Sequence, residues 1–233
     1  MDFVTANGRQ HTFATLLGDG QGRFVPGPVT SLGSGQDYYS IAFGDIDGDG
    51  HLDLVVAMSG PKPEVGPGQM ITRRGDGSGA FEEASGSPLI VPADPRLEAL
   101  AHMNRDQHLD LVISHSSSQI SVLLNNGNGT LTPAPASPYP LERQAFAVVV
   151  ADVNRDQQVD LVAATVNSHS SPFESGITVL LGDGGGYVPA PGSPFRAGAG
   201  AYNLTVGDVN RDGRLDIAAP SFEGDAVTVL LGQ

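Results

Sequence analysis

The segment at residues 44–57 reads GDIDGDGHLDLVVA and places four aspartates within nine positions of a glycine-rich loop. A hard divalent cation such as Ca²⁺ takes about six to eight oxygen ligands, and carboxylates at positions 1, 3 and 5 of a tight loop can converge on it. Position 7 adds a backbone carbonyl, and here an aspartate follows at position 9. The pattern predicts an ion site made by Asp45, Asp47, Asp49 and Asp53, with the carbonyl oxygen of His51.

The same arrangement returns as HMNRDQHLD, DVNRDQQVD and DVNRDGRLD. We number the four loops one (45–53), two (102–110), three (152–160) and four (208–216). An ordinary aspartate-rich turn is the alternative, but the return of the same ligand positions in several loops favours an ion site. The further predicted ligands are Asp208, Asn210, Asp212, Arg214 and Asp216 in loop four, Asp152, Asn154, Asp156, Gln158 and Asp160 in loop three, and more weakly Asn104, Asp106, His108 and Asp110 in loop two.

The four loops differ at two positions that decide their expected affinity. Loops one and four have Gly50 and Gly213 at position 6, where the sharp turn favours glycine, whereas loop three has Gln157. Loop two begins with His102, and imidazole suits transition metals better than Ca²⁺. We expect the order one and four, then three, then two, with two to four structural Ca²⁺ ions.

Short apolar segments lie on both sides of every loop. YYSIAFGD, RLEALAHM, AFAVVVAD and YNLTVGDV lead into the loops, and LDLVVA, LDLVIS, VDLVAA and LDIAAP follow them. They are rich in Val, Ile and Leu and bounded by turn residues, which indicates buried strands. Further strands around QMITRR, QISVLL, GITVLL and AVTVLL end in glycine-rich hairpin turns such as GDGSG. No segment has a sustained helical period, so helix should be nearly absent.

Strand groups that repeat every 50–57 residues are typical of β-propeller blades. The expected fold class is all-β, a propeller of four-stranded antiparallel blades with about five blade equivalents, on its own or as part of a larger propeller. We expect a single domain over residues 1–233. Its repeats fall near 1–30 (partial, without its first strand), 36–90, 95–140, 144–195 and 200–233 (partial, without its fourth strand).

The FGD of residues 43–45, the acidic loops, the LDLVVA-type strands and the LLGDGxGxF turns together resemble FG-GAP/VCBS repeats, the blades of integrin-α-type propellers. The resemblance covers the whole chain. It implies that calcium serves as scaffold on one face and that a partner binds the loops of the opposite face. These loops are residues 7–11, 60–68, 115–119, 167–175 and 221–225, with the segments near Tyr38, Tyr39 and Tyr202. The candidate ligand-face residues are Tyr38, Tyr39, His115, His169 and Glu174.

Composition limits the function classes. With 26 acidic and 12 basic residues the formal charge is −14, which disfavours nucleic acid and anionic membrane surfaces as partners. The absence of cysteine excludes disulfides and a thiol nucleophile. No GxSxG nucleophile elbow is present, and no helix follows the glycine-rich turns to hold a phosphate. No catalytic constellation was found, so we expect a protein that is not an enzyme.

The expected function is therefore a calcium-stabilised extracellular binding or cell-adhesion module with a protein or glycan ligand. One alternative is a carbohydrate-active enzyme or its lectin-like accessory domain, although the chain has no Trp and only five Tyr for sugar stacking. Another is a structural subunit of an extracellular assembly that self-associates through its incomplete terminal blades. The resemblance implies secretion or a cell-surface location, yet residues 1–10 have no basic start followed by an apolar core, so no signal peptide is expected within this chain.

Overall fold

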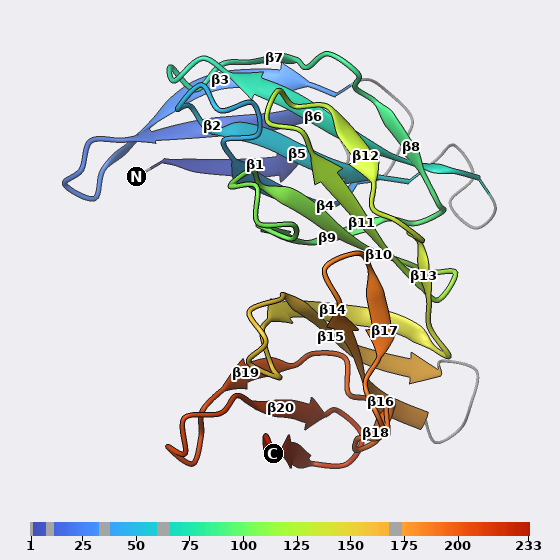
Figure 1. Cartoon of the computed structure of the whole chain (residues 1–233). Helices are drawn as coiled ribbons and strands as arrows, with labels where there is room; N and C mark the ends of the chain where they lie inside the picture. Colours follow the sequence, from blue (N-terminus) through green and yellow to red (C-terminus); the bar gives the residue numbers. More distant parts are fainter. Residues whose placement is uncertain (1, 8–11, 33–37, 60–65, 168–173) are drawn as a thin grey trace.

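The computed structural model describes residues 2–7, 12–32, 38–59, 66–167 and 174–233. Within these ranges the regular elements are all β-strands, and they form five antiparallel sheets that follow one another along the chain (Figure 1). The prediction of an all-β chain without helices is confirmed for the described residues.

The two terminal sheets have three strands each. The N-terminal sheet contains β1 (Phe3–Asn7), β2 (Thr12–Gly18) and β3 (Phe24–Ser31), and the C-terminal sheet contains β19 (Thr205–Gly207), β20 (Asp216–Ser221) and β21 (Ala226–Leu230).

The three middle sheets share one plan. The first contains β4 (Tyr38–Gly44), β5 (Asp53–Met58), β6 (Gly68–Gly75), β7 (Phe81–Glu83) and β8 (Leu89–Val91). The second contains β9 (Arg96–Ala101), β10 (Asp110–His115), β11 (Gln119–Asn125), β12 (Leu131–Pro133) and β13 (Tyr139–Pro140). The third contains β14 (Gln144–Ala151), β15 (Asp160–Asn167), β16 (Glu174–Gly182), β17 (Tyr187–Pro189) and β18 (Phe195–Arg196). In each, two short strands pair with the third strand, so the sheet has four strand positions.

The second strand of each middle sheet lies in the core. All six residues of β5 and all six of β10 are buried, which explains why these strands read as continuous apolar runs and not as alternating ones. Along β5, Leu54 and Val56 pack toward the N-terminal sheet, whereas Val55 and Ala57 pack toward the sheet of β9–β13. Each middle sheet is thus covered on both faces by its neighbours, as in propeller blades.

Figure 1 shows the five sheets in an arc that does not close, consistent with a partial propeller. Within the described ranges no further sheet covers the outer faces of the two terminal sheets, and apolar side chains are exposed there. Val25 and Val29 of β3 are 60% and 65% exposed, and Val227 and Val229 of β21 are 62% and 46% exposed.

Candidate metal centre and the opposite face

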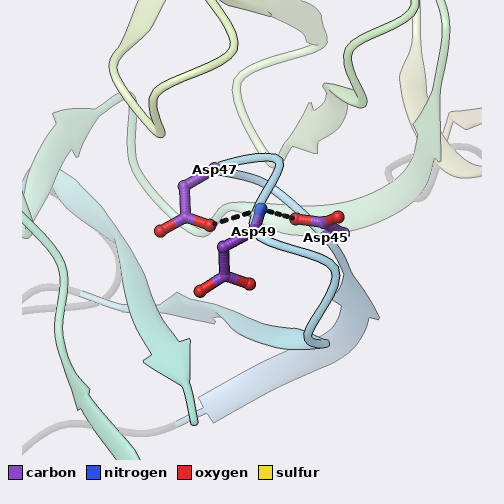
Figure 2. A group of neighbouring side chains, drawn as sticks. All are labelled: Asp45, Asp47 and Asp49. Carbon is purple, nitrogen blue, oxygen red and sulfur yellow. Dashed lines mark hydrogen bonds between the residues drawn. The ribbon is translucent and has the colours of Figure 1, made fainter. Parts of the chain in front are cut away.

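Each acidic loop joins the first strand of a sheet to the second. In loop one, Gly44 at the end of β4 pairs with Asp53 at the start of β5, so the loop is the tip of a hairpin. Asp45, Asp47 and Asp49 offer carboxylate oxygens that all lie within 4.8 Å of one another. Figure 2 shows that Asp47 and Asp49 point to the same side of the loop. A cluster of hard oxygen donors at this spacing fits a divalent cation and could hold one.

The backbone of the loop wraps around the first aspartate. The carboxylate of Asp45 accepts hydrogen bonds from the N–H groups of Gly48 at 2.7 Å, Asp49 at 3.1 Å and Gly50 at 2.9 Å. Gly48 and Gly50 have φ values of 78° and 88°, which favour glycine. The same pattern recurs when Asp208 accepts from Asp212 and Gly213, and when Asp152 accepts from Asp156 and Gln157.

At position 3 the loops diverge. Loops two, three and four have an asparagine whose side-chain amide donates to the aspartate at position 5, at 2.8, 2.9 and 3.0 Å respectively. In loop one this position is Asp47, which cannot donate. Instead Arg74 of β6 reaches the loop, with Nε 2.5 Å from Oδ2 of Asp47 and Nη2 3.6 Å from Oδ2 of Asp49. The charge of Asp47 raises the pKa of Arg74 above its usual value.

The aspartate at position 9 is turned into the sheet. Asp53 is fully buried, and its carboxylate accepts the N–H of Ile46 at 2.8 Å and that of Gly75 at 2.9 Å. These two bonds join the loop and the third strand to the second strand. The other copies make the same pair of bonds: Asp110 with Met103 and Asn125, Asp160 with Val153 and Gly182, and Asp216 with Val209 and Gly232.

Burial raises the pKa of Asp53, Asp110 and Asp160, and the backbone N–H groups oppose that shift. Both oxygens of each carboxylate already accept a hydrogen bond, and Asp53 stands outside the cluster of three aspartates. The structure thus gives the position-9 aspartates a structural role that the spacing alone did not indicate, and their role as metal ligands stays a prediction.

Loop two contains bonds that the other loops do not have. Nδ1 of His102 lies 2.9 Å from the carbonyl oxygen of His108, the very oxygen that was expected to bind a metal. Arg105 donates from Nε and Nη2 to the carbonyl oxygen of Gln157 in loop three, at 3.1 and 2.5 Å. The predicted lower affinity of this loop stays a prediction, and these contacts are consistent with it.

Asn125 is a structural residue of the site that the sequence did not predict. It stands at the position of Gly75 and Gly182, is 1% exposed, and donates from Nδ2 to the carbonyl oxygens of Ile46 at 2.7 Å and Leu109 at 3.2 Å. The bond to Ile46 ties the second middle sheet to loop one of the sheet before it. The available signal was the NNG turn in place of GDG.

The face opposite the loops is defined by strand direction. First strands end at the acidic loops and second strands begin there, so the starts of β9 and β14 and the end of β20 lie at the other face. Four residues form a row there, which we call the aromatic row: Arg96, Phe146, Tyr202 and Phe222. The Arg96 guanidinium lies 5.7 Å from the Phe146 ring, Phe146 lies 4.9 Å from Tyr202, and Tyr202 lies 6.2 Å from Phe222. Phe222 is 80% exposed.

The candidate ligand-face residues have different outcomes. Glu174 begins β16 on this face and has a carboxylate oxygen 3.7 Å from Nη2 of Arg143; both line one surface pocket with Arg196. Tyr38 and Tyr39 belong to β4, and their side chains lie outside the described part. His169 lies outside the described residues.

His115 ends β10 and points inward. It is 1% exposed, and its Nε2 lies 2.8 Å from the Ser121 hydroxyl. Among the described residues no hydrogen-bond partner lies within bonding geometry of its Nδ1. Burial lowers the pKa of His115 to about 4, and the backbone carbonyls of Ala93 and Pro92 oppose that shift. The expectation that His115 sits on an exposed loop is not met, because a side chain so enclosed offers no surface to a partner.

The sheets, their face-to-face packing and the repeated acidic hairpins define a propeller-type repeat protein. The model of the FG-GAP-like repeat matches residues 1–56 and 102–163, just over half of the chain, and the chain belongs to this family. No curated protein matches the chain significantly. FG-GAP repeats often bind calcium, are typical of extracellular proteins and are generally non-catalytic. Among the described residues no helix is present that could cross a membrane.

Proposed function

We propose that this chain is a calcium-stabilised extracellular binding or adhesion module whose partner, a protein or a glycan, binds the face opposite the acidic loops. The observation that carries the proposal is the contrast between the two faces. On one face the loop aspartates accept backbone N–H groups, and Asp45, Asp47 and Asp49 of loop one cluster closely enough to hold a cation. On the other, the aromatic row ends in the exposed ring of Phe222 and continues through the partly buried rings of Tyr202 and Phe146.

The calcium part of the proposal follows from mass action. An ion bound only by the folded chain stabilises it, by about 2.7 kcal/mol at a hundredfold excess over Kd. Melting temperature is measured with Ca²⁺ and with a chelator. We expect a higher value with Ca²⁺ for the wild type, and a smaller gain for Asp212→Asn, which weakens a predicted ligand of loop four. Asp183→Asn, in an exposed turn outside the acidic loops, is the matched control and keeps the full gain. An unchanged melting temperature on chelation rejects calcium binding.

The partner part is tested on a glycan array and by polysaccharide turnover. Exposed aromatic rings contribute strongly to binding because they are rigid and bury large apolar area. Glycan binding by the wild type that is lost in Phe222→Ser and kept in Val188→Ser, an exposed apolar residue of β17, supports the aromatic row as a glycan surface. Turnover that is abolished by Glu174→Gln rejects the non-enzymatic proposal in favour of the carbohydrate-active alternative.

A structural-subunit role is favoured by one observation, the exposed valines of β3 and β21 on the two end sheets. Uncovered sheets of this kind associate readily. Mass measurement in solution decides this alternative, since a strict monomer at high concentration contradicts it.

A further inference from the structure

We propose that Arg74 is a built-in counter-ion of loop one, which competes with a divalent cation for Asp47 and Asp49 and makes this site weaker than its aspartates alone would make it. The proposal rests on the calcium binding proposed above. It concerns the residue that sets the affinity of one site, and it changes the order that the ligand sets predict, since loop one then falls below loop four.

The guanidinium already occupies the place of a cation. Its Nε and Nη2 atoms contact Oδ2 of Asp47 and Oδ2 of Asp49, at 2.5 and 3.6 Å. These carboxylates stand at positions 3 and 5, two of the three that cluster. Calcium binds oxygen at about 2.3–2.6 Å, so an ion at the same oxygens would lie next to a positive guanidinium. Like charges at that distance repel, and a bound ion must displace Arg74.

The other repeats lack both halves of this pair. The residues that match Arg74 are Leu124, Leu181 and Leu231, each directly before the residue that bonds the position-9 aspartate. The residues that match Asp47 are Asn104, Asn154 and Asn210, whose neutral amides donate a hydrogen bond to the carboxylate at position 5. The extra carboxylate and the arginine therefore occur together, and Arg74 offsets the charge that Asp47 adds.

Loop four shows what a weaker version of this contact looks like. Nη1 of Arg214 lies 3.7 Å from Oδ2 of Asp212 and reaches one carboxylate only. Arg74 reaches two carboxylates, at a shorter distance to the first, and Asp47 is enclosed, with 11% of its side chain exposed against 32% for Asp212. Competition is therefore stronger in loop one.

Arg74 can move away from loop one and still have an acidic neighbour and solvent around its charge. Its side chain is 54% exposed, and Glu82 of β7 stands directly opposite Arg74 in the strand register. Residues paired in this way have neighbouring side chains. When a cation enters loop one, the guanidinium of Arg74 can therefore swing to Glu82 and water. Binding of the ion then replaces the pair with Asp47 by a pair with Glu82.

The test is calcium titration by calorimetry on the chain after chelator treatment. Arg74→Leu introduces the residue of the other repeats, and we expect a rise in affinity at one site of up to about fivefold, the effect of removing a partly exposed charge pair. Arg74→Lys keeps the charge and stays close to wild type. Arg73→Leu is the matched control: it removes the same charge from the same strand, but Arg73 pairs with Glu83 and not with the loop, so affinity at loop one is unchanged.

A double variant, Asp45→Asn with Arg74→Leu, checks that the rise in calcium affinity comes from loop one. We expect the added Asp45→Asn change to abolish that rise. Equal calcium affinity in the wild type and Arg74→Leu, with calcium bound elsewhere in both, overturns the role of Arg74 and leaves the proposed function standing. An equal gain in Arg73→Leu also overturns it, because the effect would then be one of net charge. No calcium bound by any variant rejects both proposals.

Discussion

The buried position-9 aspartates should matter for stability without any ion, and Asp160→Ala is the sharpest test. Its carboxylate is 0% exposed and accepts the N–H groups of Val153 and Gly182 at 2.8 and 2.9 Å. Removing it leaves a buried donor at Gly182 and a partly buried one at Val153 without a partner. A hydrogen bond to a charged group contributes about 1.5–3 kcal/mol, so two such bonds give about 3–6 kcal/mol.

The lower end of that range is the better expectation. Burial raises the pKa of Asp160, so the ionised carboxylate itself carries a desolvation cost that the alanine variant no longer has. We therefore expect a loss of about 3 kcal/mol. For a chain of this length each kcal/mol lowers the melting temperature by about 2–4 °C, which gives a fall of about 6–12 °C in chelator.

Asp183→Ala is the matched control. Asp183 also accepts two backbone N–H groups, from Gly185 and Gly186 at 2.9 and 2.7 Å, but it lies in an exposed turn where water replaces it. We expect a loss below about 1 kcal/mol. Melting of both variants is followed by circular dichroism in chelator. Equal losses in the two variants would refute the argument that burial of the bonded donors sets the cost.

Two further predictions concern residues of the second middle sheet. The pKa of His115 is lowered to about 4, so the native side chain stays neutral while the unfolded chain takes up a proton below pH 6.5. The free energy of unfolding that this histidine contributes is therefore full above pH 6.5 and is lost as the pH falls toward 4. In urea titrations between pH 6.5 and 4, the free energy of unfolding of the wild type should fall by about 3 kcal/mol more than that of His115→Gln. Equal falls in the two proteins would contradict this. Asn125→Gly restores the residue of the other repeats but leaves the carbonyl oxygen of Ile46 without its 2.7 Å donor, so we expect a loss of about 1–3 kcal/mol in thermal melts; no loss would argue against the inter-sheet bond.

The sequence predicted the strands and the loops for a physical reason. Each repeat has the same elements, so a weak pattern such as LDLVVA becomes strong when it recurs as LDLVIS and VDLVAA beside the same acidic loop. The second strands are buried on both faces, and their continuous apolar runs predict this burial. The clustering of Asp45, Asp47 and Asp49 also follows from local spacing, because a tight hairpin fixes where alternate side chains point.

What the sequence did not indicate depends on residues that meet across strands or sheets. Arg74 contacts Asp47 from another strand, and Asn125 contacts Ile46 from another sheet. The polar segment SHSSS predicts a loop at His115, yet β10 extends as far as His115 and the side chain turns inward. Departures from the repeat consensus marked the first two contacts, but only the register shows which partner each residue reaches.

The cross-links of the second middle sheet have a consequence for the chain in environments poor in calcium. His102 bonds His108, Arg105 bonds Gln157, and Asn125 bonds Ile46, so side-chain bonds hold loop two and link this sheet to loops one and three. Its rigidity should therefore vary little with ion supply. With calcium bound at loops one and four as proposed, its removal is expected to loosen those two hairpins first, while the second middle sheet keeps its bonds.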